Sequence, residues 1–392
     1  MSDLSVQVRR HVGQHLRRTR HALGWTLEDV TTRLAHDGVR LSRSTLHRIE
    51  TGRTVLALET VSALCRVMGV PFGYLEEIVR SAAAQREIDL TGYRFEELIA
   101  QGHALGARGR VALALQHFEA AHDWVLLQEQ LDDRDDSLAT ALVHMADCQR
   151  RLRHFALSQE AATRALNLDG CSPENRLRAV LLNVSIGYMT RDFYRAALFA
   201  EHAERELPHA SEPVQAFGYY VTGNLHYLQE RYREAIVRFR RAERLYRRLD
   251  APLQLSRLYV TMGHALARSE DGNGGASLIH DGYRMARKNR FHEVELYGLR
   301  ILGLVDAERD DPDSALFHFE HAARLARRLG LTHELFLAWH GIWTVSRRHQ
   351  DRDRERHARR ALKRLLKKIN PELREAEQFV TTLALEDRGS KP

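Results

Sequence analysis

Between residues 4 and 79 the apolar positions recur at helical spacing and are interrupted at short intervals by glycine and polar turn residues. The clearest example is an apolar ladder at three-residue spacing from Leu58 to Val67, which ends before Gly69. Recurrence every three to four residues is typical of helices that bury one face. The pattern therefore predicts about five short helices in this region and no strands.

The turn residues also mark where these helices begin and end. The first helix is expected to run from about Leu4 to Leu23, and Thr26 is placed to cap the second. Ser42 precedes the segment R-S-T-L-H-R-I-E, which stops before Gly52 and predicts a third helix. Ser and Thr hydroxyls at such positions accept hydrogen bonds from backbone amides that the first turn of a helix leaves unpaired.

From about residue 94 the chain repeats itself with a period close to 40 residues. Small residues mark the second helix of each unit at Ala114, Ser158, Ala196, Ala235, Gly275 and Ala315. In three of these six units a phenylalanine follows four positions later. Small residues let two antiparallel helices approach closely, and the larger residue fills the gap to the next pair. The period thus predicts a stack of helix pairs.

These patterns divide the chain into an N-terminal domain at residues 1–80, a linker at 81–93 and a repeat domain at 94–392. Six units fill the repeat domain to about residue 330, and a degenerate seventh with a terminal helix from Pro371 is expected to cap the array. In the fifth unit the segment S-E-D-G-N-G-G-A is expected to replace a helix start by a flexible turn. The predicted fold class is all-α, with a five-helix domain followed by a right-handed α-solenoid.

Charge and cysteine content narrow the class of protein. Residues 1–80 hold 12 arginines against 8 carboxylates, whereas the rest of the chain is nearly balanced, so the N-terminal domain suits phosphate contacts. The three cysteines are far apart and form no C-x-x-C pair, which fits a reducing cytoplasm. Neither a signal peptide nor an 18-residue apolar run is found, so we expect a cytoplasmic protein that does not contact membranes.

Two pairs of histidines are the candidate metal ligands of the sequence. His11 with His15, and His318 with His321, have a spacing that one helix face could offer to a metal, but no third ligand stands at a fixed offset. Walker, G-x-S-x-G, H-E-x-x-H and Rossmann glycine motifs are missing. We therefore expect no metal, no cofactor and no enzymatic activity.

Three segments in order, R-x-x-x-G-W-T-L-E-D-V, L-S-R-S-T-L-H-R-I-E-T-G and L-E-T-V-x-x-L-C-x-x-M-G-V, resemble the Cro and phage-repressor class of helix-turn-helix domains. In that class the third helix enters the major groove of double-stranded DNA. The resemblance implies base contacts from Arg43, Ser44, His47 and Arg48 and phosphate contacts from Ser42 and Thr45. It also implies a structural ion pair between Arg20 and Glu50. The alternative is a helical protein-protein module with surface arginines.

Two departures from the class concern the second helix. Leu27 stands where a phosphate-contacting Gln is common, and Thr31 stands where a small Ala usually packs. The link between the second and third helices is also about five residues longer than the short form of the motif. These departures put the contacts of the second helix in doubt and leave the third helix unaffected.

The second pattern is similar to the tetratricopeptide repeat, whose core reads small-x11-A-x3-F-x2-A. In that repeat the first helix of each pair lines the inner surface of a curved array. The resemblance places these candidate ligand-binding residues on that surface: Tyr220, Asn224, Tyr227, His264, Tyr297, Arg300, Trp339, Trp343 and Arg347. Asn can bond a peptide backbone, aromatic rings can bury side chains, and Arg can bind a carboxylate.

The combination of both parts resembles the peptide-responsive quorum-sensing regulators of the Rgg and PlcR type. The resemblance implies a homodimer assembled through the repeats, which holds two DNA-reading domains about one helical turn apart on a palindromic site. It also implies a short peptide as the ligand of the groove. Two alternatives remain open: a repeat scaffold that docks a protein, with incidental DNA binding, and a phosphatase acting on aspartyl phosphate. The basic stretch 347–368 is either a solvated capping helix or a surface for phosphates or an acidic partner.

Overall fold

The computed structural model describes residues 3–54, 57–70, 77–79, 92–128, 130–269, 272–369 and 374–389. Every regular element in these ranges is a helix, as the apolar pattern predicts. By its contacts the chain divides into two compact units, Met1–Ile186 and Gly187–Pro392. Within the described ranges, none of the helices combines the length and apolar character needed to cross a membrane.

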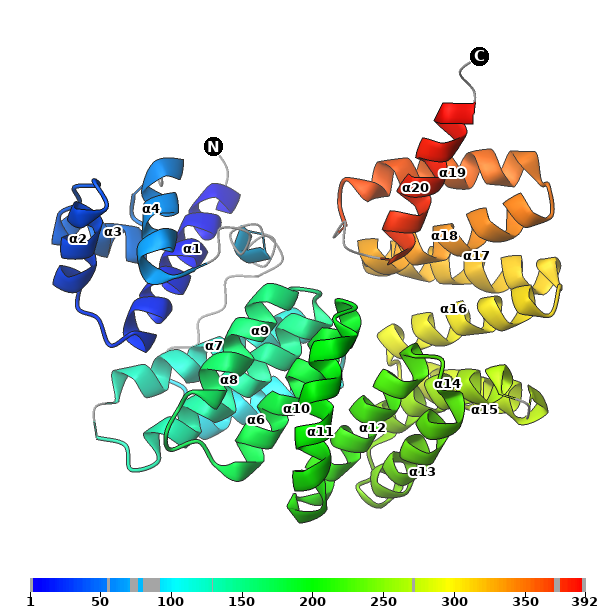
Figure 1. Cartoon of the computed structure of the whole chain (residues 1–392), viewed down its shortest axis with the longest axis horizontal. Coiled ribbons are helices and arrows are strands. Elements are labelled where there is room, and N and C mark those ends of the chain that lie inside the picture. Colours follow the sequence, from blue (N-terminus) through cyan, green and yellow to red (C-terminus); the bar gives the residue numbers. More distant parts are fainter. Residues whose placement is uncertain are drawn as a thin grey trace. The chain divides into compact units, whose positions relative to one another are not determined.

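The N-terminal helices in the first unit are α1 (Asp3–Ala22), α2 (Leu27–His36), α3 (Arg43–Glu50) and α4 (Leu58–Met68) (Figure 1). Their predicted caps are confirmed. The Thr26 hydroxyl accepts from the backbone amide of Asp29, and the Asp29 carboxylate accepts from the Thr26 amide in return. Ser42 caps α3 by accepting from the Thr45 amide. The expected fifth helix falls largely outside the described residues, of which 77–79 are helical.

Close packing of α1 on α3 fixes the position of the third helix. Leu46 and Ile49 of α3 are 1% and 3% exposed and join the apolar core of these helices. Gly13 of α1 lies against the end of α3, where a Cβ atom would come within 2.2 Å of the Ile49 carbonyl oxygen. Because these contacts bury one side of α3, its opposite side is left to solvent.

The rest of the first unit consists of antiparallel helix pairs. These helices are α6 (Phe95–Ala107), α7 (Val111–Leu127), α8 (Arg134–Arg151) and α9 (Phe155–Leu166), followed by α10 (Pro173–Met189), which continues into the second unit. Gly102 of α6 faces the ring of Phe118 in α7 so closely that a Cβ atom would lie 2.5 Å from it. The predicted close approach of two helices at a small residue is therefore confirmed in this pair. Phe118 also stacks on His144 of α8 at 4.9 Å between ring centroids, so its ring fills the gap to the next pair as expected.

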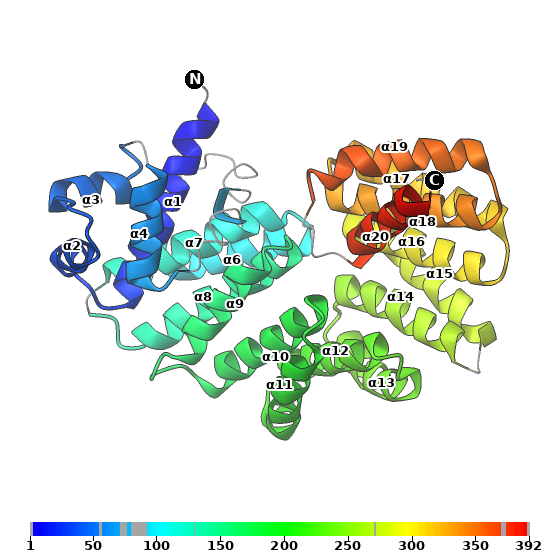
Figure 2. The same cartoon turned by 45° about the horizontal axis from the view of Figure 1, so that its top comes forward.

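The second unit continues the same pattern. Its helices are α11 (Phe193–Glu206), the short 3-10 helix η1 (Leu207–His209), α12 (Glu212–Leu228), α13 (Tyr232–Arg248), α14 (Pro252–Arg268), α15 (Gly272–Lys288), α16 (His292–Glu308), α17 (Pro312–Leu329), α18 (Thr332–Arg348), α19 (Arg352–Leu366) and α20 (Arg374–Gly389). Figure 2 shows α12, α14, α16 and α18 in succession, and each contacts the next. Gly223 and Gly303 meet the rings of Phe239 and Phe319, as the repeat predicts.

The glycine-rich start of the fifth unit differs from the prediction. Helix α15 already begins at Gly272, so residues 272–275 are helical rather than a flexible turn. A Cβ atom on Gly275 would lie 2.4 Å from the carbonyl oxygen of Gly263 in α14. The glycines therefore allow the two helix backbones to touch, and this packing outweighs the low helix propensity of glycine.

The seventh helix pair departs from the repeat and is covered by the terminal helix. Trp343 stands forty residues after Gly303, where the earlier pairs have a small residue. The Trp343 ring is 5% exposed and packs edge-on against Phe379 of α20 at 5.2 Å between ring centroids. Phe379 is itself fully buried and also meets Phe336. Helix α20 thus caps the array, as the sequence predicts.

Candidate functional site

The outer face of α3 carries the candidate DNA-reading residues. Ser42, Arg43, Ser44, His47 and Arg48 are exposed. Thr45 is half-buried, and its hydroxyl lies 2.8 Å from that of Ser42, so part of its hydrogen-bonding capacity is used locally. Helix α3 thus presents cationic and hydroxyl side chains to solvent on one face, while its opposite face packs against α1. Their contacts with DNA stay a prediction.

One of these arginines already has a partner within the domain. The Arg43 guanidinium donates to the carboxylate of Glu28 on α2 at 2.9 Å, with both side chains about two-thirds exposed. Exposed ion pairs of this kind contribute only about 0–1 kcal/mol, so the pair would yield to a stronger acceptor. Glu28 can therefore hold the Arg43 side chain in place without preventing Arg43 from contacting DNA.

The predicted structural pair behind α3 is present. Arg20 of α1 donates two hydrogen bonds to the Glu50 carboxylate at 2.7 and 2.8 Å, and a third to the Trp25 carbonyl oxygen. The Arg20 and Glu50 side chains are only 9% and 3% exposed. Such a two-pronged contact fixes the end of α3 against α1 in both distance and angle.

A second arginine of α1 joins the domain to the repeats. Arg18 donates to both carboxylate oxygens of Asp123 on α7 at 2.8 and 2.9 Å and lies 3.7 Å from Glu119 on the same helix. The Arg18 side chain is 10% exposed. Burial by itself raises the pKa of Asp123, but the Arg18 guanidinium outweighs burial and holds this pKa well below its usual range. We call this contact between α1 and the repeat helices the joint.

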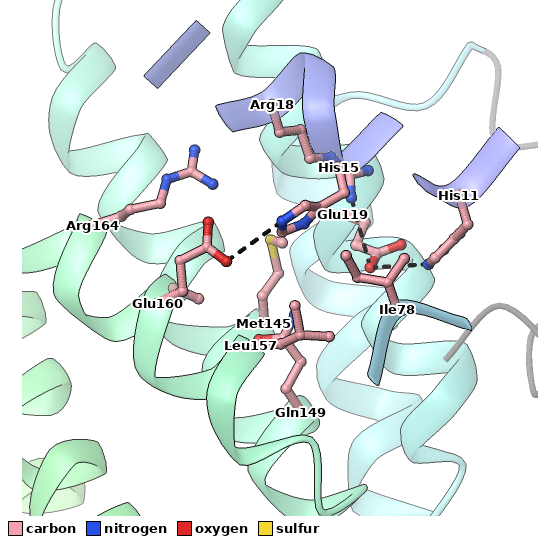
Figure 3. A pocket seen from close by; sticks show the side chains of 11 residues that line it. His11, His15, Arg18, Ile78, Glu119, Met145, Gln149, Leu157, Glu160 and Arg164 are labelled. Atoms are coloured by element: carbon pink, nitrogen blue, oxygen red, sulfur yellow. Dashed lines mark ion pairs between the residues drawn. The ribbon is translucent and has the colours of Figure 1, made fainter. Parts of the chain in front are cut away.

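Two histidines of α1 belong to the same joint, as Figure 3 shows. His11 approaches Glu119 at 4.0 Å, and His15 approaches Glu160 of α9 at 3.6 Å. Burial lowers the pKa of His15 to about 3, with further lowering from Arg164 and Arg18. The histidines that the sequence offered as metal ligands thus lie against carboxylates in an interdomain contact.

The cavity in the joint is small. It has a volume of about 30 Å³ and is lined by side chains of α1, α7, α8 and α9, together with Ile78 (Figure 3). A space of this size accommodates about one water molecule rather than an organic ligand. The described residues hold no group of three His, Cys, Asp or Glu side chains arranged for a metal ion. The joint is therefore a contact between two parts of the chain and not a ligand pocket.

Apolar and backbone contacts complete the joint. Leu157 of α9 is 5% exposed and belongs to the apolar core of the N-terminal helices, together with Ile78. The backbone amide of Leu157 donates to the buried Glu77 carboxylate at 3.0 Å. The joint was not predicted, although His11, His15 and Arg18 share one face of α1 and Glu119 and Asp123 are four residues apart on α7. That complementary spacing was the available signal.

The second unit brings several candidate ligand-binding residues together. The Tyr227 hydroxyl of α12 hydrogen-bonds the His264 ring of α14, and Tyr297 of α16 lies 3.2 Å from the Thr261 hydroxyl. The Arg300 guanidinium lies over the Tyr297 ring at 5.4 Å. Burial lowers the pKa of His264 to about 4, so its ring is neutral near pH 7. We call Tyr227, His264, Tyr297 and Arg300 the inner cluster.

The remaining candidates are arranged differently. Tyr220 is half-buried and packs on Phe239, while Asn224 is 8% exposed and donates to the Tyr220 carbonyl oxygen of its own helix. The Arg347 guanidinium lies 5.5 Å from the centroid of the Trp343 ring, which α20 covers.

Trp339 packs on the same apolar cluster as Trp343. It also lines a pocket formed with α17 and α19, which the other candidates do not line. A shift of one position along a helix turns a side chain by about 100°, and Trp339 is one position off the register that Tyr220 and Arg300 share. The role of all nine residues in ligand binding stays a prediction.

The chain matches a family model described as a helix-turn-helix domain over residues 11–76. The match begins within α1, extends through α2, α3 and α4, and includes the exposed face of α3. No curated protein matches the sequence.

Solved structures similar to the chain share its fold at low sequence identity. A Rap protein in complex with Competence and Sporulation Factor has a TM-score of 0.55 at 15% identity, over 88% of this chain and 99% of that one. The Rap conjugation gene regulator of plasmid pLS20, in complex with the Phr* peptide, has a TM-score of 0.55 at 13% identity, over 91% and 96%. PlcR of Bacillus thuringiensis, in complex with the peptide PapR7 and DNA, has a TM-score of 0.43 at 16% identity, over 75% and 99%.

These comparisons agree with both parts of the structure. The family match covers the segment that contains the exposed face of α3 and the buried Arg20 and Glu50. The likeness to the Rap structures extends over most of the chain and therefore includes the helix pairs. The described residues are thus helical throughout their regular elements, and the chain joins an N-terminal helix-turn-helix domain to a tetratricopeptide-like array with the fold of Rap proteins.

Proposed function

We propose that the protein is a sequence-specific, DNA-binding transcriptional regulator without catalytic activity. The observation that carries this proposal is the exposed face of α3, whose Arg43 and Arg48 project from a helix held by the buried Arg20–Glu50 pair. An arginine fork can bond the O6 and N7 atoms of guanine in the major groove, and each such contact contributes about 1–3 kcal/mol of discrimination. The Ser42 hydroxyl and the N-terminus of α3 offer phosphate contacts.

We also propose that the repeats bind a short peptide at the inner cluster. The cluster combines aromatic rings with the cation of Arg300, which suits apolar side chains together with a carboxylate. The Rap regulator of similar fold that was solved with the Phr* peptide supports this class of ligand. In this proposal the peptide carboxylate contacts Arg300, and its apolar side chains pack on Tyr227 and Tyr297.

The joint gives a physical reason why the repeats can control DNA binding. Arg18, His11 and His15 attach α1 directly to α7 and α9, so the helix-turn-helix domain moves with the first repeats rather than freely. We propose a homodimer in which the repeats set the separation of two α3 helices on a palindromic site. A peptide would change DNA affinity only by binding one arrangement of the dimer more tightly than the other.

A selection experiment tests the proposed function. The full-length protein would be incubated with random DNA duplexes at fixed salt, and the bound duplexes would be sequenced over several rounds. We expect enrichment of an inverted repeat whose halves are centred about 10–11 base pairs apart, one turn of DNA. Equal recovery of all sequences, with binding that falls steeply with salt, would contradict the proposal, because phosphate contacts by themselves give that behaviour.

A further inference from the structure

A pocket of about 460 Å³ opens between α17, α18 and α19 in the second unit. Its lining includes Arg324 and Arg327 of α17, Trp339 of α18 and His357 of α19. Pockets of about 300–1,000 Å³ are typical of small-molecule sites in proteins. The volume is more than ten times that of the cavity in the joint, so an organic ligand fits here and not there.

The pocket lies in the seventh helix pair, which departs from the repeat pattern. Forty residues before Trp339 stands Leu299 of α16, and forty before that stands Tyr259 of α14; these are 1% and 5% exposed, whereas Trp339 is half-buried. The Trp339 ring is therefore less enclosed than its counterparts in the earlier pairs, and part of it lines the pocket.

Aromatic and apolar side chains form one part of the pocket wall. The rings of Trp339 and His357 lie 5.1 Å apart between centroids with 54° between their planes. Ile342 and Ala323 are buried and contribute aliphatic surface. Aromatic rings attract another planar ring in offset or edge-to-face geometry, so this wall suits a flat aromatic group.

The carboxylates that line the pocket already have cationic neighbours. Glu320 lies 3.9 Å from Arg354, and Asp353 lies 2.6 Å from Arg356. These two carboxylates are therefore balanced locally and repel an incoming anion less than free carboxylates would.

The two arginines of α17 are available for an anion. Within the described ranges, no carboxylate lies at ion-pair distance from Arg324 or Arg327, which stand three residues apart on one helix face. Guanidinium groups bond carboxylates through parallel N–H donors, a geometry that lysine cannot supply. The pocket thus offers cationic donors beside an aromatic wall.

We propose that this pocket binds a small molecule that carries a planar aromatic ring and a carboxylate. The ring lies against Trp339 and His357, and the carboxylate is held by Arg324 and Arg327. The site shares neither helix face nor residues with the inner cluster or with α3, so the inference does not depend on DNA binding or on the peptide.

Calorimetric titration of the full-length protein with 2-naphthoate tests the assignment. We expect saturable binding with one site per chain, and affinity lower by about tenfold or more for 2-naphthamide, which keeps the rings and loses the charge. Acetate, which has the charge without the ring, should bind at least about tenfold more weakly as well. The variants Arg327→Ala and Trp339→Ala should each lower the affinity for 2-naphthoate by about tenfold.

Arg328→Ala is the matched control, because Arg328 is an exposed neighbour on α17 that does not line the pocket. It should leave the affinity within about twofold, and unchanged thermal unfolding would show that all variants are folded. No saturable binding at millimolar 2-naphthoate would overturn the assignment. Equal losses in Arg328→Ala and Arg327→Ala would also overturn it, as would tight binding of an acidic peptide without an aromatic residue in place of 2-naphthoate.

Discussion

The two exposed arginines of α3 and the two buried arginines of α1 belong to one small domain but differ in their exposure to solvent and in their hydrogen-bond partners. Arg43 and Arg48 are exposed, and the Glu28 partner of Arg43 is itself mostly exposed. Arg20 and Arg18 are about nine-tenths buried, and each donates two hydrogen bonds to one carboxylate. The buried pair of arginines therefore fixes where α3 lies, and the exposed pair remains free to contact another molecule.

The largest effect is expected at the Arg20–Glu50 pair. Arg20→Ala leaves the Glu50 carboxylate buried without its charged partner, which should destabilise the helix-turn-helix domain by about 3–5 kcal/mol. Hydrogen-deuterium exchange of α1 to α4 would measure this loss. Arg17→Ala, an exposed neighbour on α1, is the control and should change protection by less than about 0.5 kcal/mol. Similar protection from exchange in the two variants would contradict a structural role for the Arg20–Glu50 pair.

The next effect is expected at the joint. Arg18→Ala should loosen α1 from α7 by about 2–3 kcal/mol, less than at Arg20 because the Asp123 side chain is 41% exposed. Exchange should rise on the facing sides of α1 and α7, while the protection of α3 stays unchanged. Arg18→Lys should restore part of the contact. An Arg18→Ala variant with unchanged exchange in α7 would show that the joint contributes no docking energy.

Acidification should weaken the same contact through His15. Its pKa in the folded chain is about 3, below the ordinary histidine value of 6.5, so between these pH values the unfolded chain binds a proton at this residue and the folded chain does not. Stability is therefore full above pH 6.5 and falls as the pH drops toward 3, by about 2 kcal/mol at pH 5 from this residue. His15→Gln should flatten the pH dependence by that amount, and His36→Gln, an exposed change on α2, should leave it intact. A His15→Gln profile as steep as the native one would contradict the assignment.

The smallest effect is expected at Arg43. Its exposed ion pair with Glu28 should contribute less than about 1 kcal/mol, so Arg43→Ala should leave the unfolding of the domain nearly unchanged. Raising the salt concentration should shrink even this difference, because exposed charges are screened. A loss comparable to that of Arg20→Ala would erase the distinction between the two kinds of arginine.

The sequence predicted those features that depend on local patterns. The caps at Thr26 and Ser42, the pairing of Arg20 with Glu50, and the small-residue contacts of the repeats all follow from spacing within one helix or one repeat unit. The helical start of α15 was missed because glycine has a low helix propensity, and only the close approach of α14 explains it.

The joint and the placement of Trp339 could not be predicted in the same way. The joint depends on how two regions a hundred residues apart meet. The complementary spacing of charges on α1 and α7 makes the two helices compatible, but spacing within each helix does not show that they pack together. Trp339 was assigned to the inner surface by repeat register, and a displacement of one residue in a degenerate unit is enough to place it elsewhere. Long-range packing therefore set the limit of the sequence analysis.

The most direct test of the central claim compares DNA specificity between arginine variants. The affinity of the full-length protein for its selected site and for a scrambled duplex would be measured at several salt concentrations. We predict that Arg43→Ala with Arg48→Ala lowers the ratio of the two affinities by about tenfold or more, while Arg10→Ala weakens both affinities alike and reduces the salt slope by about one. An unchanged ratio in the Arg43 and Arg48 variant would contradict the assignment of α3 as the DNA-reading helix.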